Sequence, residues 1–579
     1  MKGWTPNWEK TDTKWIFVGM ATSGLVIEVL YFWHALGNSS LVMYFATLCV
    51  AGSAFAGSSM GRRTTHLYLI VICSVLYYGI YSLSSHGLSY IQSSDGLFHW
   101  ENAKLILEQG RVPFGHGIPQ GTKAYAYSFY PVAHILLATL ASFTSVDLVT
   151  VVNLFPLVMV MGPILIYAIS RRLLGSERIA AVAATVFIFT PGAYPFPSYR
   201  YLALILFLVL FLSILSSGVT GRRAVLISGL LAVSIGLCHG VTAVLTVGMM
   251  LFLLVSRARR FPFVFRSTFA ETRGFALAGY VLVLILAILW SLTVAYPAFS
   301  FSLEESQLWQ LWFMSSLFSS GVKSYSYMTG FSPLEVYFDF ASLICTLFLA
   351  LVGFVVYLRS RPNRLLLGLL IYTGLLFVLF QAARGISEIA DNLAERMWAF
   401  LFIGLSLLVG LAVRGSHNRS HAHHFWKAFQ AVGLVILLCF SVTGVNLVKS
   451  YYEPESPALL NYGESIIGSV RWYENVSSAS AIAIGDSPVR DFALSLNRTV
   501  FFHWDLYYNS SRIPTTISDL KSEGVHYVFV DHLMSVVQEE PNWRGVIPTA
   551  SAGDLATIGG SRSLDRVLDN GVVQILLII

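Results

Sequence analysis

The chain has 579 residues, of which 55% are hydrophobic and only 12% are charged, and its formal net charge is +6. Soluble domains carry about 25% charged residues, so this composition excludes one large soluble core and indicates a protein with many membrane spans. Lys and Arg cluster in short loops between apolar runs, which suggests contact with anionic lipid headgroups and gives no reason to expect nucleic-acid binding.

The basic loops predict the topology, because Lys and Arg mark the cytoplasmic side of a span. We expect about 13 spans, with the N-terminus cytoplasmic and the C-terminus outside. The apolar run 131–143 is treated differently, since a span there would move Arg171-Arg172 outside and invert every later basic loop. It is therefore predicted to be an interfacial or re-entrant helix on the outer face. The predicted spans are 15–36, 41–59, 67–85, 149–170, 178–190, 200–217, 224–238, 241–256, 275–297, 337–358, 365–381, 397–413 and 428–448.

The first outer segment, 86–148, is too long for a simple connection and carries candidate catalytic residues. A helix starting near Asp95 would place Asp95 and His99 on one face, pointing together into a cleft. A carboxylate there can take a proton from an acceptor hydroxyl or amide. The alternative is that Asp95 caps this helix, because Ser-Ser-Asp-Gly is a capping sequence. Further candidate substrate-binding residues in this segment are Lys123, Tyr130 and His134.

Basic residues at the predicted outer ends of spans form a second group of candidates. Arg396, preceded by Glu395, and Arg200 both lie there against the positive-inside trend. A guanidinium at this depth can bind the phosphate of a lipid-linked substrate through two hydrogen bonds. The alternative is that these side chains extend to the headgroups. His239, between two predicted spans, is either a packed histidine or a site residue.

After Val448 the composition changes, and short apolar runs alternate with helical patterns. This pattern predicts a transmembrane domain at 1–448 followed by an extracytoplasmic α/β domain at 449–579. The second domain has no Gly-rich phosphate loop, so we assign it no catalytic role of its own. Its predicted strands are 481–484, 500–502, 527–530 and 572–579, with helices at 489–496 and 517–523.

Most of residues 67–256 resemble the GT-C superfamily of integral membrane glycosyltransferases. The superfamily includes protein O-mannosyltransferases, aminoarabinose transferases and oligosaccharyltransferases. The resemblance rests on Ser94-Asp95-Gly96-Leu97-Phe98-His99 after a span, on the helix start Tyr130-Pro131-Val132-Ala133-His134, and on a later span ending at Arg171-Arg172. It implies a helical membrane bundle with interfacial helices in the first outer loop.

The resemblance also implies an activity, an inverting transfer (EC 2.4 class) from a polyprenyl-phosphate-linked sugar with Asp95 as general base. Arg396 matches the position of an outer-face arginine with which relatives bind the lipid phosphate. His134 lies near the position at which some relatives have a lysine. Metal-dependent members place acidic residues in the outer loop that corresponds to 191–199, which has no carboxylate here. We therefore expect no required cofactor, with Glu304 or Glu305 as the alternative if a divalent metal is bound.

The leading hypothesis is thus a multi-pass plasma-membrane glycosyltransferase that modifies a glycan, lipid or protein acceptor on the outer or lumenal face. A transporter or flippase of a lipid-linked or amphiphilic substrate is the alternative. It predicts inverted repeats and charged or broken spans near the midplane, whereas the ionisable residues here concentrate at the outer ends of spans. A non-catalytic scaffold would leave the long first loop unexplained.

Overall fold

The structure is a computed structural model of the chain. It describes residues 63–83, 94–116, 127–188, 199–215, 222–257, 333–359, 364–383, 388–412, 464–478, 480–485, 498–501, 513–531, 552–570 and 573–579, with isolated positions at 285, 289, 290, 293, 489 and 493. The predicted spans at 15–36, 41–59 and 428–448, and the predicted domain boundary after 448, lie outside the described residues.

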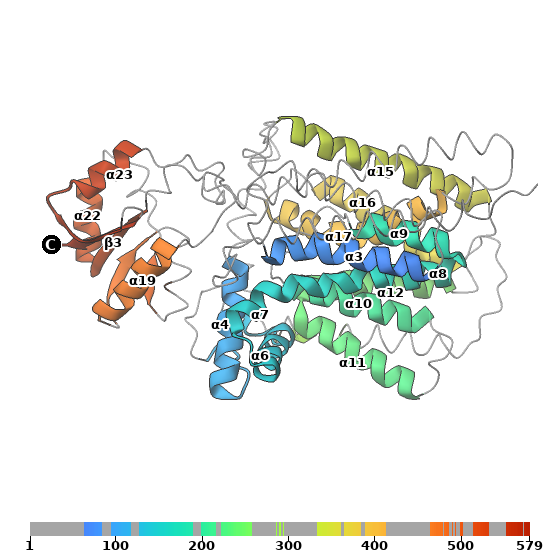
Figure 1. Cartoon of the computed structure of the whole chain (residues 1–579), viewed down its shortest axis with the longest axis horizontal. Helices are drawn as coiled ribbons and strands as arrows, with labels where there is room; N and C mark the ends of the chain where they lie inside the picture. Colours follow the sequence, from blue (N-terminus) through green and yellow to red (C-terminus); the bar gives the residue numbers. More distant parts are fainter. Residues whose placement is uncertain are drawn as a thin grey trace, which may run out of the picture.

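A bundle of long apolar helices makes up most of the described chain (Figure 1). Apart from 275–297, each predicted span that falls in the described residues corresponds to one of these helices. The helices are α3 (Arg63–Leu83), α8 (Met161–Leu174), α9 (Glu177–Ile188), α10 (Tyr199–Leu215), α11 (Arg222–Cys238), α12 (Gly240–Arg257), α15 (Pro333–Arg359), α16 (Arg364–Ala383) and α17 (Glu388–Ala412).

One continuous helical stretch has the length and the hydropathy of a membrane crossing. It is formed by α7 (Leu148–Leu154), the 3-10 segment η2 (Phe155–Val160) and α8, and it runs from Leu148 to Leu174. Among the described residues it alone meets both criteria, and the other apolar stretches of the bundle are shorter. The total number of spans therefore stays a prediction.

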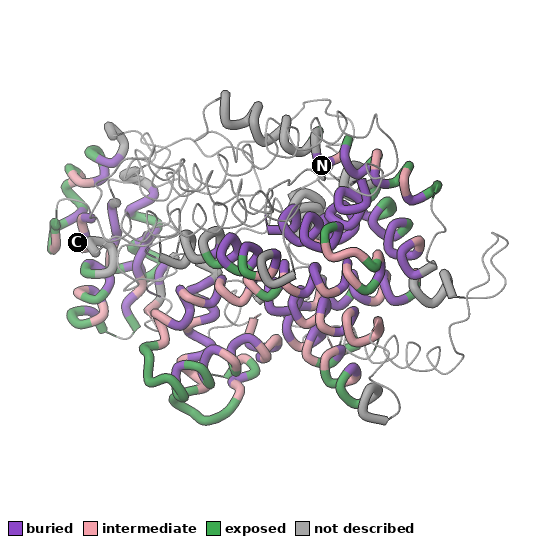
Figure 2. Tube along the Cα trace, turned by 45° about the vertical axis from the view of Figure 1, so that its right-hand side comes forward, coloured by how far each residue is buried: buried purple, intermediate pink, exposed green. Residues whose placement is uncertain are grey.

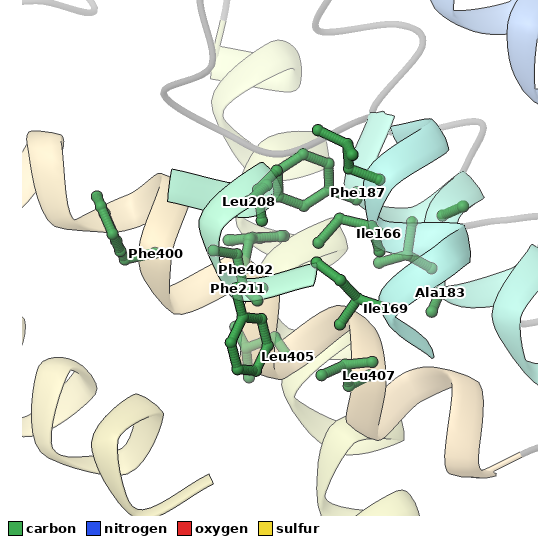
Figure 3. Close-up of a cluster of buried hydrophobic side chains, with 14 of the residues drawn as sticks. Ile166, Ile169, Ala183, Phe187, Leu208, Phe211, Phe400, Phe402, Leu405 and Leu407 are labelled. Carbon is green, nitrogen blue, oxygen red and sulfur yellow. The ribbon is translucent and has the colours of Figure 1, made fainter. Parts of the chain in front are cut away.

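The core of the bundle lies where α8, α9 and α10 meet α17 (Figure 3). Residues 400–412 of α17 are all buried. Four alanines of α9 are fully buried, and a Cβ added at Gly410 of α17 would lie 2.8 Å from the carbonyl oxygen of Ile179 in α9. Small residues let two helix backbones approach closely, which is how helices associate when lipid supplies no hydrophobic drive.

Basic residues gather at one end of this bundle. Arg172, in the last turn of α8, donates a hydrogen bond to the carbonyl oxygen of Leu215 at the end of α10 (3.4 Å). Gly353, near the end of α15 at Arg359, packs against Leu408 near the end of α17. This basic end agrees with the charge pattern of the sequence. Which side of the membrane it occupies stays a prediction.

The opposite end of the bundle carries two helices from the predicted first outer segment. Figure 1 shows α4 (Ser94–Gln109) running across the bundle end instead of along its axis, with α6 (Val132–Thr144) packed beside it. α6 has 13 residues and packs against α4, which does not run along the bundle axis (Figure 1). Helix α6 ends at Ser145, which has the left-handed conformation (φ 56°). Asp147 then caps the start of α7, because its side chain accepts a hydrogen bond from the amide of Val149 (2.8 Å). The arrangement agrees with a helix that does not span.

The bundle and the end that carries α4 and α6 also differ in how far their residues are buried. The centre of the bundle is buried, whereas the residues after α4 and the turn between α6 and α7 are exposed (Figure 2). The ring of Phe143 in α6 is 86% exposed. An apolar ring that projects from a helix at the bundle end is suited to the boundary between headgroups and acyl chains.

The C-terminal part forms a five-stranded sheet in the order β2-β1-β3-β5-β4, beyond the bundle end that carries α4 (Figure 1). Strands β2, β1 and β3 are parallel, and β5 is antiparallel to both β3 and β4. The four predicted strands correspond to β1, β2, β3 and β5, whereas β4, α19 and α23 were not predicted. The elements are α19 (Glu464–Val476), β1 (Ile482–Ile484), β2 (Thr499–Phe501), α22 (Ile513–Ser522), β3 (Val525–Asp531), α23 (Ala552–Gly559), β4 (Leu564–Asp569) and β5 (Val573–Ile578).

Candidate functional site

The candidate site begins at the first turn of α4, which contains Asp95. The helix starts at Ser94, close to the predicted start. Amide N–H groups in a first helical turn have no partner within the helix and carry a partial positive charge. This position therefore favours the ionised form of a carboxylate. The side chain of Asp95 lies outside the described residues, so its role as base stays a prediction.

One turn further along α4, His99 meets His134 of α6. A hydrogen bond of 2.9 Å joins Nδ1 of His99 to Nε2 of His134. The two side chains are 2% and 1% exposed. This histidine pair (His99 and His134) links two helices that are 35 residues apart in the chain. His99 was predicted to face a cleft together with Asp95, but its ring is instead buried between α4 and α6.

Tyr127, just before α6, packs on the histidine pair from the other side. Its ring stacks on the ring of His99, with centroids 5.5 Å apart and an angle of 12° between the planes. The same tyrosine meets Phe98 edge to face at 6.0 Å. Asn102 also helps to order α4, because its side chain donates a hydrogen bond of 2.9 Å to the carbonyl oxygen of Phe98. The His99 ring is therefore held both at its edge and on its face.

Burial controls the protonation of these groups. It lowers the pKa of His99 from 6.5 to about 3, and it lowers the pKa of His134, with a smaller contribution from the neighbouring His99. Both rings are neutral at physiological pH, so a single hydrogen lies between the bonded nitrogens. Burial also raises the pKa of Glu101, on another face of α4, from 4.5 to about 7, while Lys104 acts in the opposite direction.

Arg200 and His239 lie at the same end of the bundle as α6. Arg200 is in the first turn of α10, and His239 is the residue between α11 and α12. Their neighbours Ala203 and Cys238 belong to the same buried apolar cluster as Ala133 of α6. The sequence predicted Arg200 as a phosphate ligand, left His239 as either a packed histidine or a site residue, and included His134 among the candidate substrate-binding residues. The structure brings their helices together at one end.

The described contacts of Arg200 and His239 are local. The guanidinium of Arg200 donates a hydrogen bond to the Tyr201 hydroxyl (3.1 Å) and lies 5.0 Å from the centre of that ring. Nδ1 of His239 accepts a hydrogen bond from the amide of Thr242 (3.2 Å) and lies 2.7 Å from its hydroxyl. The His239 ring proton is consequently on Nε2, where it can be donated. The phosphate role of both residues stays a prediction.

The other predicted site residues are described only in part. Tyr130 is half-buried in the turn before α6, and its amide donates a hydrogen bond to the carbonyl oxygen of Tyr127 (2.9 Å). Glu395 and Arg396 belong to the first half of α17, away from the basic end, and their side chains lie outside the described residues. Lys123 lies outside them entirely.

Two residues near the site were not among the predicted ones, namely Tyr127 and Glu101. A helical period starting at Asp95 places Asn102 on the face of His99, but nothing local to the sequence indicates that Tyr127 covers this face. Among the described residues, no group of three His, Cys, Asp or Glu side chains is placed to hold a metal ion. Glu304 and Glu305, the alternative metal ligands, are not among those residues.

Comparison with known families gives one match. A sequence profile described as a family of unknown function (DUF6541) matches residues 58–445, which is more than half of the chain. The chain belongs to this family. The DUF6541 region includes the bundle from α3 to α17 as well as α4 and α6, while the C-terminal sheet lies outside it. No curated protein matches the sequence.

Solved structures with a similar fold include two that are covered over most of their length. ArnT from Cupriavidus metallidurans bound to undecaprenyl phosphate is 12% identical, with 88% of this chain and 97% of that chain covered and a TM-score of 0.52. The Archaeoglobus fulgidus oligosaccharyltransferase in complex with Zn and sulfate is also 12% identical, with 81% and 68% covered and a TM-score of 0.50.

A third similar structure is a mutant of the mycobacterial arabinofuranosyltransferase AftD. It is 16% identical with a TM-score of 0.53, and the match covers 88% of this chain but 41% of that chain. These identities are too low to carry over an activity. The structural similarity shows that this DUF6541 protein shares the helical-bundle fold of these three glycosyltransferases.

Proposed function

We propose that this protein is a glycosyltransferase. It moves a sugar from a polyprenyl-phosphate-linked donor to a glycan, lipid or protein acceptor at the bundle end that carries α4 and α6. The transfer inverts the anomeric centre, and no resident metal takes part. The proposal is supported by the fold shared with glycosyltransferases and, for the donor, by undecaprenyl phosphate bound to ArnT.

The observation that carries this proposal is the placement of α4. The helix lies across the bundle end, and Asp95 belongs to its first turn, where the helix dipole favours a carboxylate. Arg200 and His239 belong to helix ends that meet α6 at the same end. Glycosyl transfer from a phosphate needs at least a base for the acceptor proton and fixed cationic or hydrogen-bond-donor groups for the leaving phosphate, and we place both at this end of the bundle.

In the proposed reaction, the Asp95 carboxylate accepts the proton of the acceptor hydroxyl or amide. The acceptor atom forms a bond to the anomeric carbon on the face opposite the donor phosphate. The bond from this carbon to the phosphate oxygen breaks, and the phosphate leaves with the electron pair. Inversion follows, because one displacement occurs from one side.

The leaving phosphate gains negative charge as its bond breaks, so fixed donors near it lower the barrier. We assign this role to Arg396 and Arg200 as guanidinium donors and to the Nε2 hydrogen of His239. Lys123, Tyr130 and Glu395 complete the proposed substrate-binding set. Arginine suits this task because its planar fork binds a phosphate through two parallel hydrogen bonds.

The test uses the full chain in proteoliposomes supplied with a panel of radiolabelled polyprenyl-phosphate sugars and candidate acceptors. Asp95→Asn keeps the shape of the side chain and removes its basicity. It is expected to lower transfer by about 10²–10⁴-fold, the usual contribution of a general base. Glu108→Gln is the matched control, since Glu108 lies on the same helix with its side chain 56% exposed.

The results separate the proposal from its alternative. Transfer that persists undiminished in Asp95→Asn would remove the catalytic assignment of this residue. Movement of a labelled donor across the bilayer without transfer by the parent protein would instead indicate a transporter or flippase.

A further inference from the structure

We infer that His134 is a positioning residue that acts through His99 to hold the first turn of α4, and with it Asp95, in the geometry needed for proton transfer. The inference rests on the proposed function, because it assigns a task within the same site. It gives His134, which the sequence offered as a candidate substrate-binding residue, a contact inside the protein instead.

The hydrogen bond is the first part of the argument. Nε2 of His134 is 2.9 Å from Nδ1 of His99, and the His134 ring is 1% exposed. A nitrogen engaged at this distance and covered by protein is poorly placed to bind a lipid phosphate as well. Its evident partner is His99, and the bond ties α6 to α4.

The second part is the way in which the His99 ring is held. His134 fixes one edge of the ring, and the Tyr127 ring covers one face at 5.5 Å with nearly parallel planes. A ring held at an edge and on a face cannot rotate without losing both contacts. The direction of Nε2, the second nitrogen of His99, is set as a consequence.

The third part is the position of His99 in α4. His99 lies one helical turn after Asp95 in α4, and its own ring is on the face that α6 covers. Asp95 lies in the first turn, and a terminal turn frays easily unless side chains hold it. The contact with His134 is only one turn away and restrains this end of the helix.

The fourth part is the cost of the pair to stability. Apolar side chains could fill the same space between α4 and α6, as they do elsewhere in this contact, where Ala103 and Leu137 are buried. Two buried imidazoles must both be desolvated, and the hydrogen bond between them recovers only part of that free energy. Polar groups that packing does not require are typical of functional sites.

The experiment compares three variants of α6 in the full chain. His134→Leu keeps the volume and removes the hydrogen bond. His134→Gln carries an amide at about the position of the imidazole Nε2 and can restore it. Leu137→Ala, a control on the same buried face, removes apolar packing and leaves the histidine pair intact.

Two readouts are measured for each variant. The first is kcat and KM for the labelled donor, normalised to folded protein. His134→Leu is expected to lower kcat by about 10- to 100-fold, the usual effect of misplacing a reacting group by an ångström, with little change in KM. His134→Gln should recover most of kcat, and Leu137→Ala should lower thermal stability without this loss of kcat.

The second readout needs no activity. It is hydrogen exchange of the backbone amides at 94–100, which should become faster in His134→Leu than in Leu137→Ala. Equal exchange in these two variants would refute the inference, as would a higher KM with unchanged kcat in His134→Leu, which indicates a phosphate ligand. Failure of the proposed function is recognised separately, by full activity of Asp95→Asn or by a parent protein that transfers nothing.

Discussion

Replacing Glu101 by Gln should remove a pH dependence of stability that originates in α4. Glu101 is only 5% exposed, and its burial raises the pKa of its carboxyl group from 4.5 to about 7. The folded protein therefore binds this proton more tightly than the unfolded chain does. Between pH 4.5 and about 7, the free energy of unfolding must fall as the pH rises, and outside this window Glu101 contributes no slope.

The size of the effect follows from the same two values. The difference between 4.5 and about 7 corresponds to roughly 3 kcal/mol, at about 1.4 kcal/mol for each pH unit. Parent and Glu101→Gln should be equally stable at pH 4.5. At pH 8 the variant should be more stable by up to this amount, because its neutral amide replaces a buried carboxylate.

The assay is thermal unfolding of the purified proteins in detergent or nanodiscs at a series of pH values. Glu108→Gln serves as the control, since this side chain is 56% exposed and lies 3.9 Å from Lys104 in a surface ion pair. The control should keep the pH profile of the parent. Parallel profiles for the parent and Glu101→Gln would refute the reasoning, because the carboxyl group would then not be buried in the folded protein.

Two further predictions concern the helices that support the site. A Cβ at Gly353 would overlap the carbonyl oxygen of Leu408 and lie 2.6 Å from its carbonyl carbon. Gly353→Ala should therefore separate α15 from α17 and lower the free energy of unfolding by about 1–3 kcal/mol, measured by thermal unfolding. Gly374→Ala is the control: it has open space around it and should be neutral or stabilising. An unchanged melting temperature in Gly353→Ala would contradict the close approach of the two helices. Asp147→Ala removes the cap of α7 and should lower stability by about 1 kcal/mol, with Asp147→Asn as the variant that retains it.

The sequence indicated that basic residues gather at one end of the bundle, because Lys and Arg in the loops set the orientation of the neighbouring spans. An arginine in the middle of a bilayer is costly, so basic pairs such as Arg171-Arg172 constrain the direction of every neighbouring span. The same reasoning predicted that 131–143 does not cross the membrane, and the structure has a short helix, α6, packed on α4 at the bundle end. The position of α6 agrees with this part of the prediction, while the direction of each span stays a prediction.

The C-terminal strands were predictable only where burial makes them apolar. β5 is buried along most of its length, and its sequence is an apolar run interrupted only by Gln574. β4 has the sequence Leu-Asp-Arg-Val-Leu-Asp, and of its residues Leu564 alone is buried. Its pairing with β5 stabilises it, and neither alternation nor an apolar run marks it in the sequence.

The histidine pair could not be predicted for a related reason. His99 and His134 were each candidate site residues, but their contact with one another depends on how α4 crosses α6. The burial of Glu101 depends on the same crossing, since a helix with Glu101, Lys104 and Glu108 on its surface would be expected to lie in solvent. Local sequence indicated the helix and its start near Asp95, but the environment of each side chain is a property of tertiary packing.

The buried polar groups of α4 indicate that this helix sequence is selected for function and not for stability. His99, Glu101 and Asn102 follow closely on one another and are all buried, although each must lose its hydration to be so. A helix that served only to anchor the loop at the membrane surface would turn an apolar face inward and leave its polar groups in water. Here three of the buried positions are polar, beside the apolar Phe98 and Ala103, and they lie within two turns of Asp95. Such a helix persists only if the geometry that it imposes on its first turn compensates for the lost stability. The first turn of α4 is therefore the place where a loss of activity, without a loss of folded protein, should be sought first.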